Sequence, residues 1–175
     1  DIPNTVAGGI RAVVELAPTF ITIHASGGRE MMKAAVDEAA TQAAKFNVPR
    51  PKLLGVTVLT SLDRADLEAT GVNADPSDQV LRLAALAHES GLDGVICSPL
   101  EIAALRKQCG PDFVLMVPGI RPVGSAANDQ KRAMTPRQAV DLGATNLVVG
   151  RPIYQAADPR AAAEAIAREA GVNDL

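Results

Sequence analysis

The sequence is poor in the residues that mark several common protein classes. It has no Trp, one Tyr and three Phe, so it lacks the aromatic platforms on which single-stranded nucleic acids stack. Its net charge is −3 and it has no basic cluster, which also argues against nucleic acid as a partner. No apolar run approaches the roughly 18 residues of a membrane span, and no signal peptide is visible. We therefore expect neither nucleic acid nor a membrane as a partner.

Cysteine and histidine are also scarce. Cys97 and Cys109 are too few for a disulfide framework, so reduced thiols and a cytoplasmic location are expected. His24 and His88 are distant from each other in the sequence, and so are Cys97 and Cys109. This spacing is not typical of metal ligands, and no metal site is predicted.

The length predicts one domain over residues 1–175, and 47% of the residues are hydrophobic, which suffices for a substantial core. The chain opens at Asp1-Ile2-Pro3-Asn4-Thr5, with no initiator Met and no strand before the first expected helix. We expect an amino-terminal part that precedes Asp1.

Short β-branched segments alternate with longer helical segments along the chain. The expected strands are 19–24, 52–59, 94–97, 113–117 and 145–149. The expected helices are 4 or 5 to about 16, 29–46, 63–69, 76 to about 90, 99 to about 109, 136–142 and 159 onward. The first of these helices is expected to be capped by Asn4 or Thr5. The strands are almost wholly apolar, which is typical of parallel strands covered on both faces.

Strict alternation of strands and helices indicates an α/β protein, either a doubly wound sheet or a (β/α)8 TIM barrel. A barrel needs three strands more than the sequence supplies, or roughly 60–70 residues at barrel-like proportions. This shortfall agrees with the expected amino-terminal part.

Two consecutive strands each run into a glycine and an arginine. The first is followed by Gly119 and Arg121, and the second by Gly150 and Arg151. Glycine lets backbone N–H groups approach an oxyanion, and arginine offers a forked, charged contact. The pattern predicts a site for a small anion, most simply a phosphate ester. The alternative for each arginine is a solvated side chain in a surface turn.

Other polar residues also follow strands. Thr60 and Ser61 offer two hydroxyls at the same edge of the sheet, although such pairs are often helix caps, and Ser61 could cap a helix from Leu62 onward. A long loop from Gly119 to Met134 carries Gln130. Its length is typical of a lid, and the alternative is a floppy insertion.

Residues near two further turns are weaker candidates. Asp1 and Thr5 flank the Pro3 turn, where the preceding strand would end, so Asp1 is a catalytic candidate by position. The alternative is a helix-capping aspartate. Gly27 and the following glycine are candidates for an anion nest, and His24 is expected to be hydrogen-bonded beneath the site.

The opening residues Asp1-Ile2-Pro3-Asn4-Thr5 resemble the end of the active-site motif D-x-K-x-x-D-I-P-N-T of the orotidine 5′-phosphate decarboxylase family. Further motifs follow in that family's order over the whole chain. They are His24-Ala25-Ser26-Gly27-Gly28, Val56-Thr57-Val58-Leu59-Thr60-Ser61, Pro118-Gly119-Ile120-Arg121-Pro122, Asp129-Gln130 and Val149-Gly150-Arg151-Pro152.

The resemblance implies the carboxyl-terminal part of a TIM barrel that works as a homodimer with shared active sites. It also implies decarboxylation of orotidine 5′-phosphate (OMP) to UMP without cofactor or metal. Asp1 then resembles the last carboxylate of a charged tetrad, donated by the partner subunit, and Thr5 a contact to the ribose or phosphate. Thr60 resembles the hydroxyl that binds the pyrimidine, with Ser61 beside it. The residues that resemble phosphate ligands are Arg121, Gln130, Gly150 and Arg151.

The sequence lacks several residues of the family: the first aspartate and the lysine of the motif, and an earlier Asp and Lys that bind the ribose. The motif's lysine, the expected proton donor, stands three positions before its last aspartate and so precedes Asp1. The resemblance therefore assigns the activity to the intact protein. The alternatives are a metal-dependent sugar-phosphate decarboxylase or synthase of the same superfamily, and a non-catalytic fragment that binds phosphate ligands.

Overall fold

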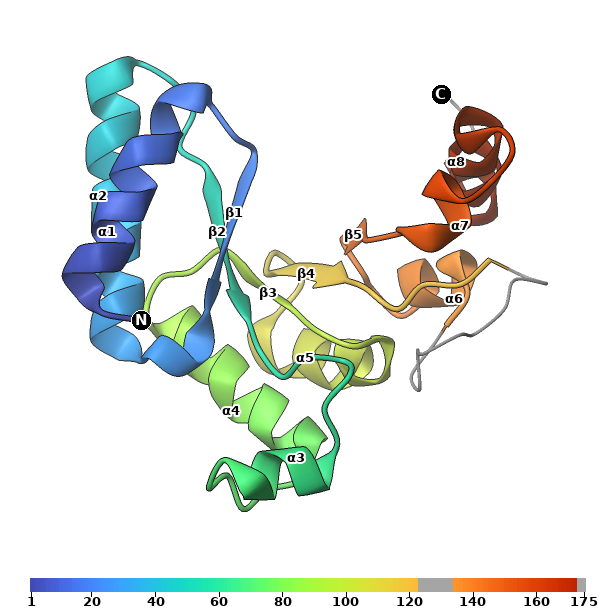
Figure 1. Ribbon diagram of the computed structural model, residues 1–175, viewed down its shortest axis with the longest axis horizontal. Coiled ribbons are helices and arrows are strands. Elements are labelled where there is room, and N and C mark those ends of the chain that lie inside the picture. The colour runs from blue at the N-terminus through green and yellow to red at the C-terminus, as the bar shows by residue number, and fades with distance from the viewer. Residues whose placement is uncertain (123–133, 173–175) are drawn as a thin grey trace.

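The computed structural model describes residues 1–122 and 134–172 and contains a five-stranded parallel sheet. The strands lie in chain order, and each pairs with the next in parallel (Figure 1). Their bounds are β1 Phe20–His24, β2 Lys52–Val56, β3 Gly94–Ile96, β4 Val114–Val117 and β5 Asn146–Leu147. The expected alternation of strands and helices is thus confirmed.

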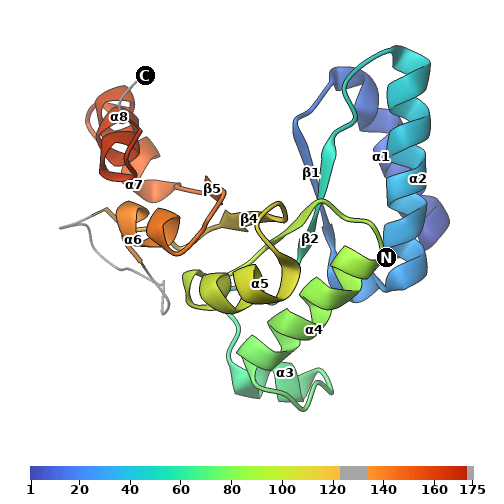
Figure 2. The ribbon, with the colours of Figure 1, turned by 180° about the vertical axis from the view of Figure 1, so that it is seen from behind.

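Helices follow the sheet round its outer side (Figures 1 and 2). The α-helices are α1 Pro3–Val13, α2 Arg29–Phe46, α3 Arg64–Ala69, α4 Pro76–Glu89, α5 Ile102–Cys109, α6 Pro136–Asp141, α7 Arg151–Tyr154 and α8 Pro159–Glu169. Short 3-10 turns cover Val14–Leu16, Ala25–Gly27 and Pro99–Glu101. The helices α1 and α2 lie side by side at one end of the sheet, and α6 to α8 lie at the other.

Local sequence signals explain where most helices begin. Thr135 caps α6 by accepting a hydrogen bond from the backbone N–H of Gln138, and Asp158 caps α8 in the same way. The expected cap of the first helix is wrong. Asn4 and Thr5 lie inside α1, whose N-cap residue Ile2 makes no side-chain cap bond. Pro3 stands at the first helical position instead, where its missing N–H costs nothing.

The core lies between the sheet and the helices. Its largest fully buried side chains include Met31 and Met32 of α2. The expectation that all strands are covered on both faces is wrong for β1, since Thr22 and His24 are exposed. These exposed residues fit the position of β1 at one end of the sheet.

All five strands are shorter than the sequence predicts, and two of them are shorter by three residues. The second strand ends at Val56 rather than at residue 59, and the last strand contains only Asn146 and Leu147. Strand length depends on the neighbour, and β5 has a paired neighbour on one side only within the described residues. No helix in this part of the chain has the length and apolarity of a membrane span.

Candidate active site

The carboxyl ends of the strands meet at one edge of the sheet because all the pairings are parallel. The ladders pair Val56 with Ile96 and Val117 with Leu147 at this edge. Backbone contacts continue beyond them, since Cys97 N–H donates to Met116 O at 3.2 Å. Every candidate residue that follows a strand in the described part of the chain therefore lies on this side, where α/β barrels place their chemistry.

Thr60 and Ser61 line a cavity of about 320 Å³ at this edge. The rest of its lining comes from the ends of β2, β3 and β4 and is mostly apolar: Val56, Val58, Leu59, Ile96, Cys97 and Pro118. The alternative in which Ser61 caps a helix is wrong. Asp63 is the N-cap of α3, and it forms a reciprocal capping box with Asp66. The two hydroxyls are therefore next to an apolar cavity that can receive a flat ring.

Cys97 lies in the wall of the same cavity and is buried. Burial raises the pKa of its thiol to about 12, and the nearby Glu101 carboxylate adds to the effect. The side chain is therefore a neutral thiol near pH 7 and not a nucleophile. It contributes shape to the cavity.

Arg121 follows β4 and is buried, with 9% of its surface exposed. Its Nη1 donates to the Ile120 carbonyl at 2.8 Å, and its backbone N–H donates to Met134 O at 2.9 Å. Its buried Nε has no hydrogen-bond partner in the described part of the chain. A buried guanidinium N–H without an acceptor is costly, so this nitrogen favours an anionic ligand. The solvated surface arginine that was the alternative is wrong here.

Arg151 follows β5 and is half-buried at the first position of α7, with Gly150 as the N-cap residue. The sequence did not predict this short helix. Arg121 and Arg151 each come four residues after the paired residues Val117 and Leu147. The two arginines therefore follow the carboxyl ends of neighbouring strands. A Cβ atom at Gly150 would meet only Tyr154, at an ordinary 3.5 Å, so contacts within the described chain do not require glycine there.

Asp1 lies beside the turn that follows β1. It lines a cavity of about 600 Å³ together with residues of that turn, including His24, Ser26 and Gly27. Its Oδ1 accepts a hydrogen bond from the N–H of Ile2 at 2.7 Å. His24 is exposed and not beneath the site as expected. Thr5 is exposed on α1. Asp1 and Thr60 thus line different cavities, and Gln130 lies outside the described residues.

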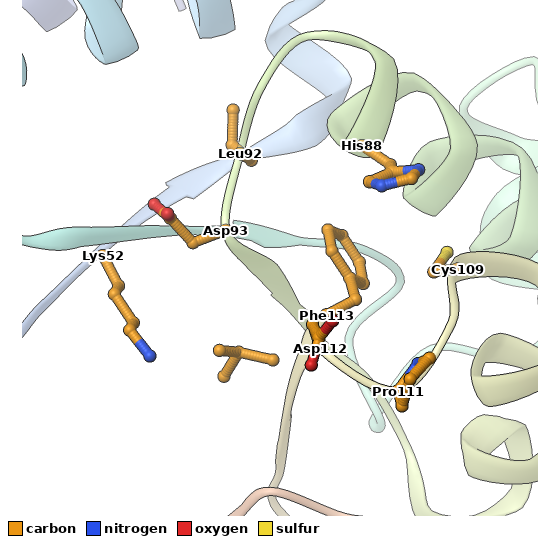
Figure 3. A pocket seen from close by; sticks show the side chains of 9 residues that line it. Lys52, His88, Leu92, Asp93, Cys109, Pro111, Asp112 and Phe113 are labelled. Atoms are coloured by element: carbon orange, nitrogen blue, oxygen red, sulfur yellow. The ribbon is translucent and has the colours of Figure 1, made fainter.

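A further cavity, of about 340 Å³, lies at the opposite, amino-terminal ends of the strands (Figure 3). Its lining includes Lys52, Asp93 and Asp112, and the ring of His88 packs edge-on against Phe113 at 5.0 Å. No signal in the sequence predicted this cavity. In barrels this face stabilises the fold, and Asp93 does so here by pairing with Arg50 at 3.0 Å. The described residues contain no cluster of His, Cys, Asp and Glu that could hold a metal ion.

A parallel sheet whose strands lie in chain order, with helices between them, is typical of the class of (β/α)8-barrel proteins. The chain belongs to the orotidine 5′-phosphate decarboxylase / HUMPS family, whose model matches residues 1–166. This membership confirms the resemblance seen in the sequence and the TIM-barrel fold class.

Individual relatives agree with the family. The chain is 54% identical to the orotidine 5′-phosphate decarboxylase of Paramagnetospirillum magneticum over 172 residues, which are 98% of this chain and 73% of that protein. It is 52% identical to the enzyme of the same name from Moorella thermoacetica, over 97% of this chain and 68% of that protein. The crystal structure of the Lactobacillus acidophilus orotidine 5′-phosphate decarboxylase matches with a TM-score of 0.83 and 43% identity. This match covers 97% of this chain and 71% of that one.

Proposed function

We propose that this protein decarboxylates OMP to UMP and CO2 in de novo pyrimidine biosynthesis, as a carboxy-lyase. The observation that carries the proposal is the agreement between family membership and the carboxyl edge of the sheet. Relatives more than 50% identical bear the enzyme's name. This edge offers an apolar cavity with two hydroxyls and, on neighbouring strands, two arginines. A nucleotide needs a cavity of this kind for its ring and cationic side chains for its phosphate.

The ligand would lie across the strand ends. Thr60 would hydrogen-bond the pyrimidine, with Ser61 beside it, and the apolar wall would cover the ring. Arg121 and Arg151 would bind the phosphate, and Gly150 N–H and Gln130 would be further ligands. The buried Nε of Arg121 supports this assignment, because a phosphate oxygen would supply the acceptor that the described chain does not.

Loss of CO2 from C6 leaves a carbanion in the plane of the ring, with no π-system to accept its charge. A cation beside C6 must stabilise that charge and deliver a proton. The family resemblance assigns both tasks to the lysine three positions before Asp1. Asp1 would hold that ammonium in place. The phosphate is remote from C6, and its binding energy would serve to close the site over the substrate and exclude water.

The test is an assay of the protein as its gene encodes it, following the pyrimidine absorbance as OMP is consumed. Arg151→Ala removes one charge-assisted phosphate contact. This should weaken transition-state binding by about 2–3 kcal/mol and so lower kcat/KM roughly 30- to 150-fold. Arg160→Ala is the matched control, because that side chain is 90% exposed on α8, and it should change nothing. Wild-type protein that releases no CO2 from OMP would refute the function. An unchanged kcat/KM in Arg151→Ala would refute the phosphate assignment.

The metal-dependent alternative is not favoured, because the named relatives are orotidine 5′-phosphate decarboxylases. The expected activity needs neither metal nor cofactor and should survive prolonged treatment with EDTA. Loss of activity on chelation, with recovery on adding Mg²⁺, would instead support a sugar-phosphate decarboxylase or synthase. The proposed location is the cytoplasm, which the free thiols of Cys97 and Cys109 support.

We further propose that the protein is a homodimer in which Asp1 and Thr5 of one subunit complete the site of the other. Two observations support this. Asp1 and Thr5 are exposed, and Asp1 lines a different cavity from Thr60. The apolar side chains of Leu59 and Leu100, beyond the ends of β2 and β3, are 46% and 63% exposed, which is typical of a surface that another chain covers.

Mixing two strongly impaired variants tests the shared site. In a random mixture of Asp1→Asn and Arg151→Ala subunits, half of the dimers are mixed, and one of the two sites in each mixed dimer carries neither change. About a quarter of the wild-type activity should therefore return. If each site takes both residues from one subunit, mixing restores nothing. Sedimentation of the wild-type protein as a monomer would also refute the dimer.

A further inference from the structure

Arg106 lies in the second half of α5, toward the amino-terminal ends of the strands, and its side chain binds five acceptors. Its Nη1 donates to the carbonyl oxygens of Gly110, Pro111 and Phe113 at 2.8, 2.9 and 2.7 Å. Its Nη2 donates to Gly143 O at 2.6 Å and to Thr145 Oγ1 at 3.2 Å. The first three acceptors lie just before β4, and the other two lie just before β5. One guanidinium therefore joins the starts of these two strands.

Neighbouring residues are adapted to this arrangement. Gly143 has a φ of +107°, and a Cβ atom there would lie 3.1 Å from Arg106 Nε, so glycine leaves room for the arginine. The hydroxyl of Thr145 also accepts a hydrogen bond from Leu115 N–H at 3.1 Å. Thr145 N–H in turn donates to Leu115 O at 2.9 Å. A continuous hydrogen-bond network thus runs from α5 through β4 to β5.

The strands that need this support most are the ones that receive it. The β4–β5 ladder contains only the pairs Met116–Asn146 and Val117–Leu147. The β1–β2 ladder contains five pairs. A short ladder fixes the relative position of two strands weakly, so the bonds made by Arg106 and Thr145 supply much of what sets the register between β4 and β5.

These two strands carry Arg121 and Arg151 at their other ends, four residues beyond the pair Val117–Leu147. A phosphate held by two guanidiniums requires a fixed distance between them, and small misplacements are costly. We propose that Arg106 is a positioning residue for the phosphate site, because it holds β4 and β5 in the register that sets Arg121 beside Arg151. This inference rests on the proposed function, since it assumes that the two arginines bind one phosphate.

The test compares Arg106→Met with Arg50→Met. Arg50 makes comparable side-chain hydrogen bonds at the same end of the sheet. Its Nη1 donates to both carboxylate oxygens of Asp93 at 3.0 Å. That carboxylate also accepts from Leu53 N–H, so it connects β2 and β3. Both variants should unfold at lower temperature than wild type. A purely structural role would leave nucleotide affinity unchanged in the folded fraction of each.

The binding of UMP and of uridine is measured calorimetrically at a temperature where all the proteins are folded. Arg106→Met should weaken UMP binding by about tenfold or more and leave uridine binding unchanged, whereas Arg50→Met should affect neither. Thr145→Val is a milder second variant, in case Arg106→Met does not fold. It removes only the shared hydroxyl and should also weaken UMP binding selectively.

Two failures can be told apart. Suppose that wild type binds UMP and consumes OMP, but neither Arg106→Met nor Thr145→Val shows a selective loss of UMP affinity. The positioning role of Arg106 is then refuted and the proposed function stands. An equal loss of UMP and uridine affinity in Arg106→Met also refutes it, because it indicates general damage to the site. If wild type does not bind UMP, the proposed function itself fails.

Discussion

Gly94 at the start of β3 is paired with Val114 at the start of β4, and a Cβ atom at Gly94 would overlap the carbonyl oxygen of Val114. The overlapped group is backbone, so it cannot rotate away as a side chain can. Glycine therefore allows the two central strands to lie as close as they do.

Gly94→Ala should destabilise the protein by about 1–3 kcal/mol, as overpacking of a core does. Gly9→Ala is the matched control, because Gly9 lies inside α1 with nothing within 4 Å of an added Cβ. There the same substitution should stabilise by about 0.5–1 kcal/mol, since alanine favours helix. Urea unfolding of both variants measures the difference. Equal stabilities would contradict the close approach of β3 and β4.

Substitutions at Asp63 and Ser61 should affect different properties, the first the stability of the fold and the second the binding of UMP. Asp63 accepts hydrogen bonds from the backbone N–H groups of Ala65 and Asp66 at 3.0 and 3.2 Å, so Asp63→Ala should cost about 1 kcal/mol in the free energy of unfolding. Ser61→Ala should leave stability within about 0.5 kcal/mol of wild type and weaken binding of UMP. The reverse pattern, with stability lost in Ser61→Ala alone, would restore the view that Ser61 is a helix cap.

Arg121 should matter more for ligand binding than for folding. Its buried Nε lacks an acceptor, so Arg121→Met should leave the free energy of unfolding within about 1 kcal/mol of wild type. The same change should remove most of the thermal stabilisation that UMP gives. Thermal unfolding with and without UMP measures both effects. A large loss of stability without ligand, together with an unchanged UMP effect, would assign Arg121 a structural role instead.

The pair Arg11–Glu38 should make stability depend on acid pH. Arg11 Nε donates to Glu38 Oε1 at 2.7 Å and so joins α1 to α2. This hydrogen bond, with a further one from Gln42, lowers the pKa of Glu38 below its ordinary 4.5. A lowered pKa means that the contribution to stability is present above pH 4.5 and is lost as the pH falls through the folded-state value. The unfolding temperatures of wild type and Glu38→Gln should therefore differ above pH 4.5 and converge in stronger acid. A difference that stays constant down to about pH 2 would contradict this account.

Much of the candidate site could be located from the sequence because its signals are local. Glycine and arginine after an apolar segment mark a strand end, and two such segments in succession mark neighbouring strands in a parallel sheet. Arg121 and Arg151 were found in this way, and Thr60 and Ser61 were found as hydroxyls that follow a strand. The sequence left open whether Ser61 caps a helix, and the structure shows that Asp63, two residues further on, caps α3 instead.

The sequence by itself determined the order of strands and helices, most helix starts, and the edge of the sheet at which the polar residues gather. Each follows from the alternation of apolar residues and from the backbone preferences of glycine, proline and capping residues. Only the tertiary structure decided that Arg121 is buried, that Gly94 has no space for a side chain, and that Arg106 reaches Gly143, 37 residues further on. These features arise where distant segments pack together, and no short stretch of sequence contains both partners of such a contact.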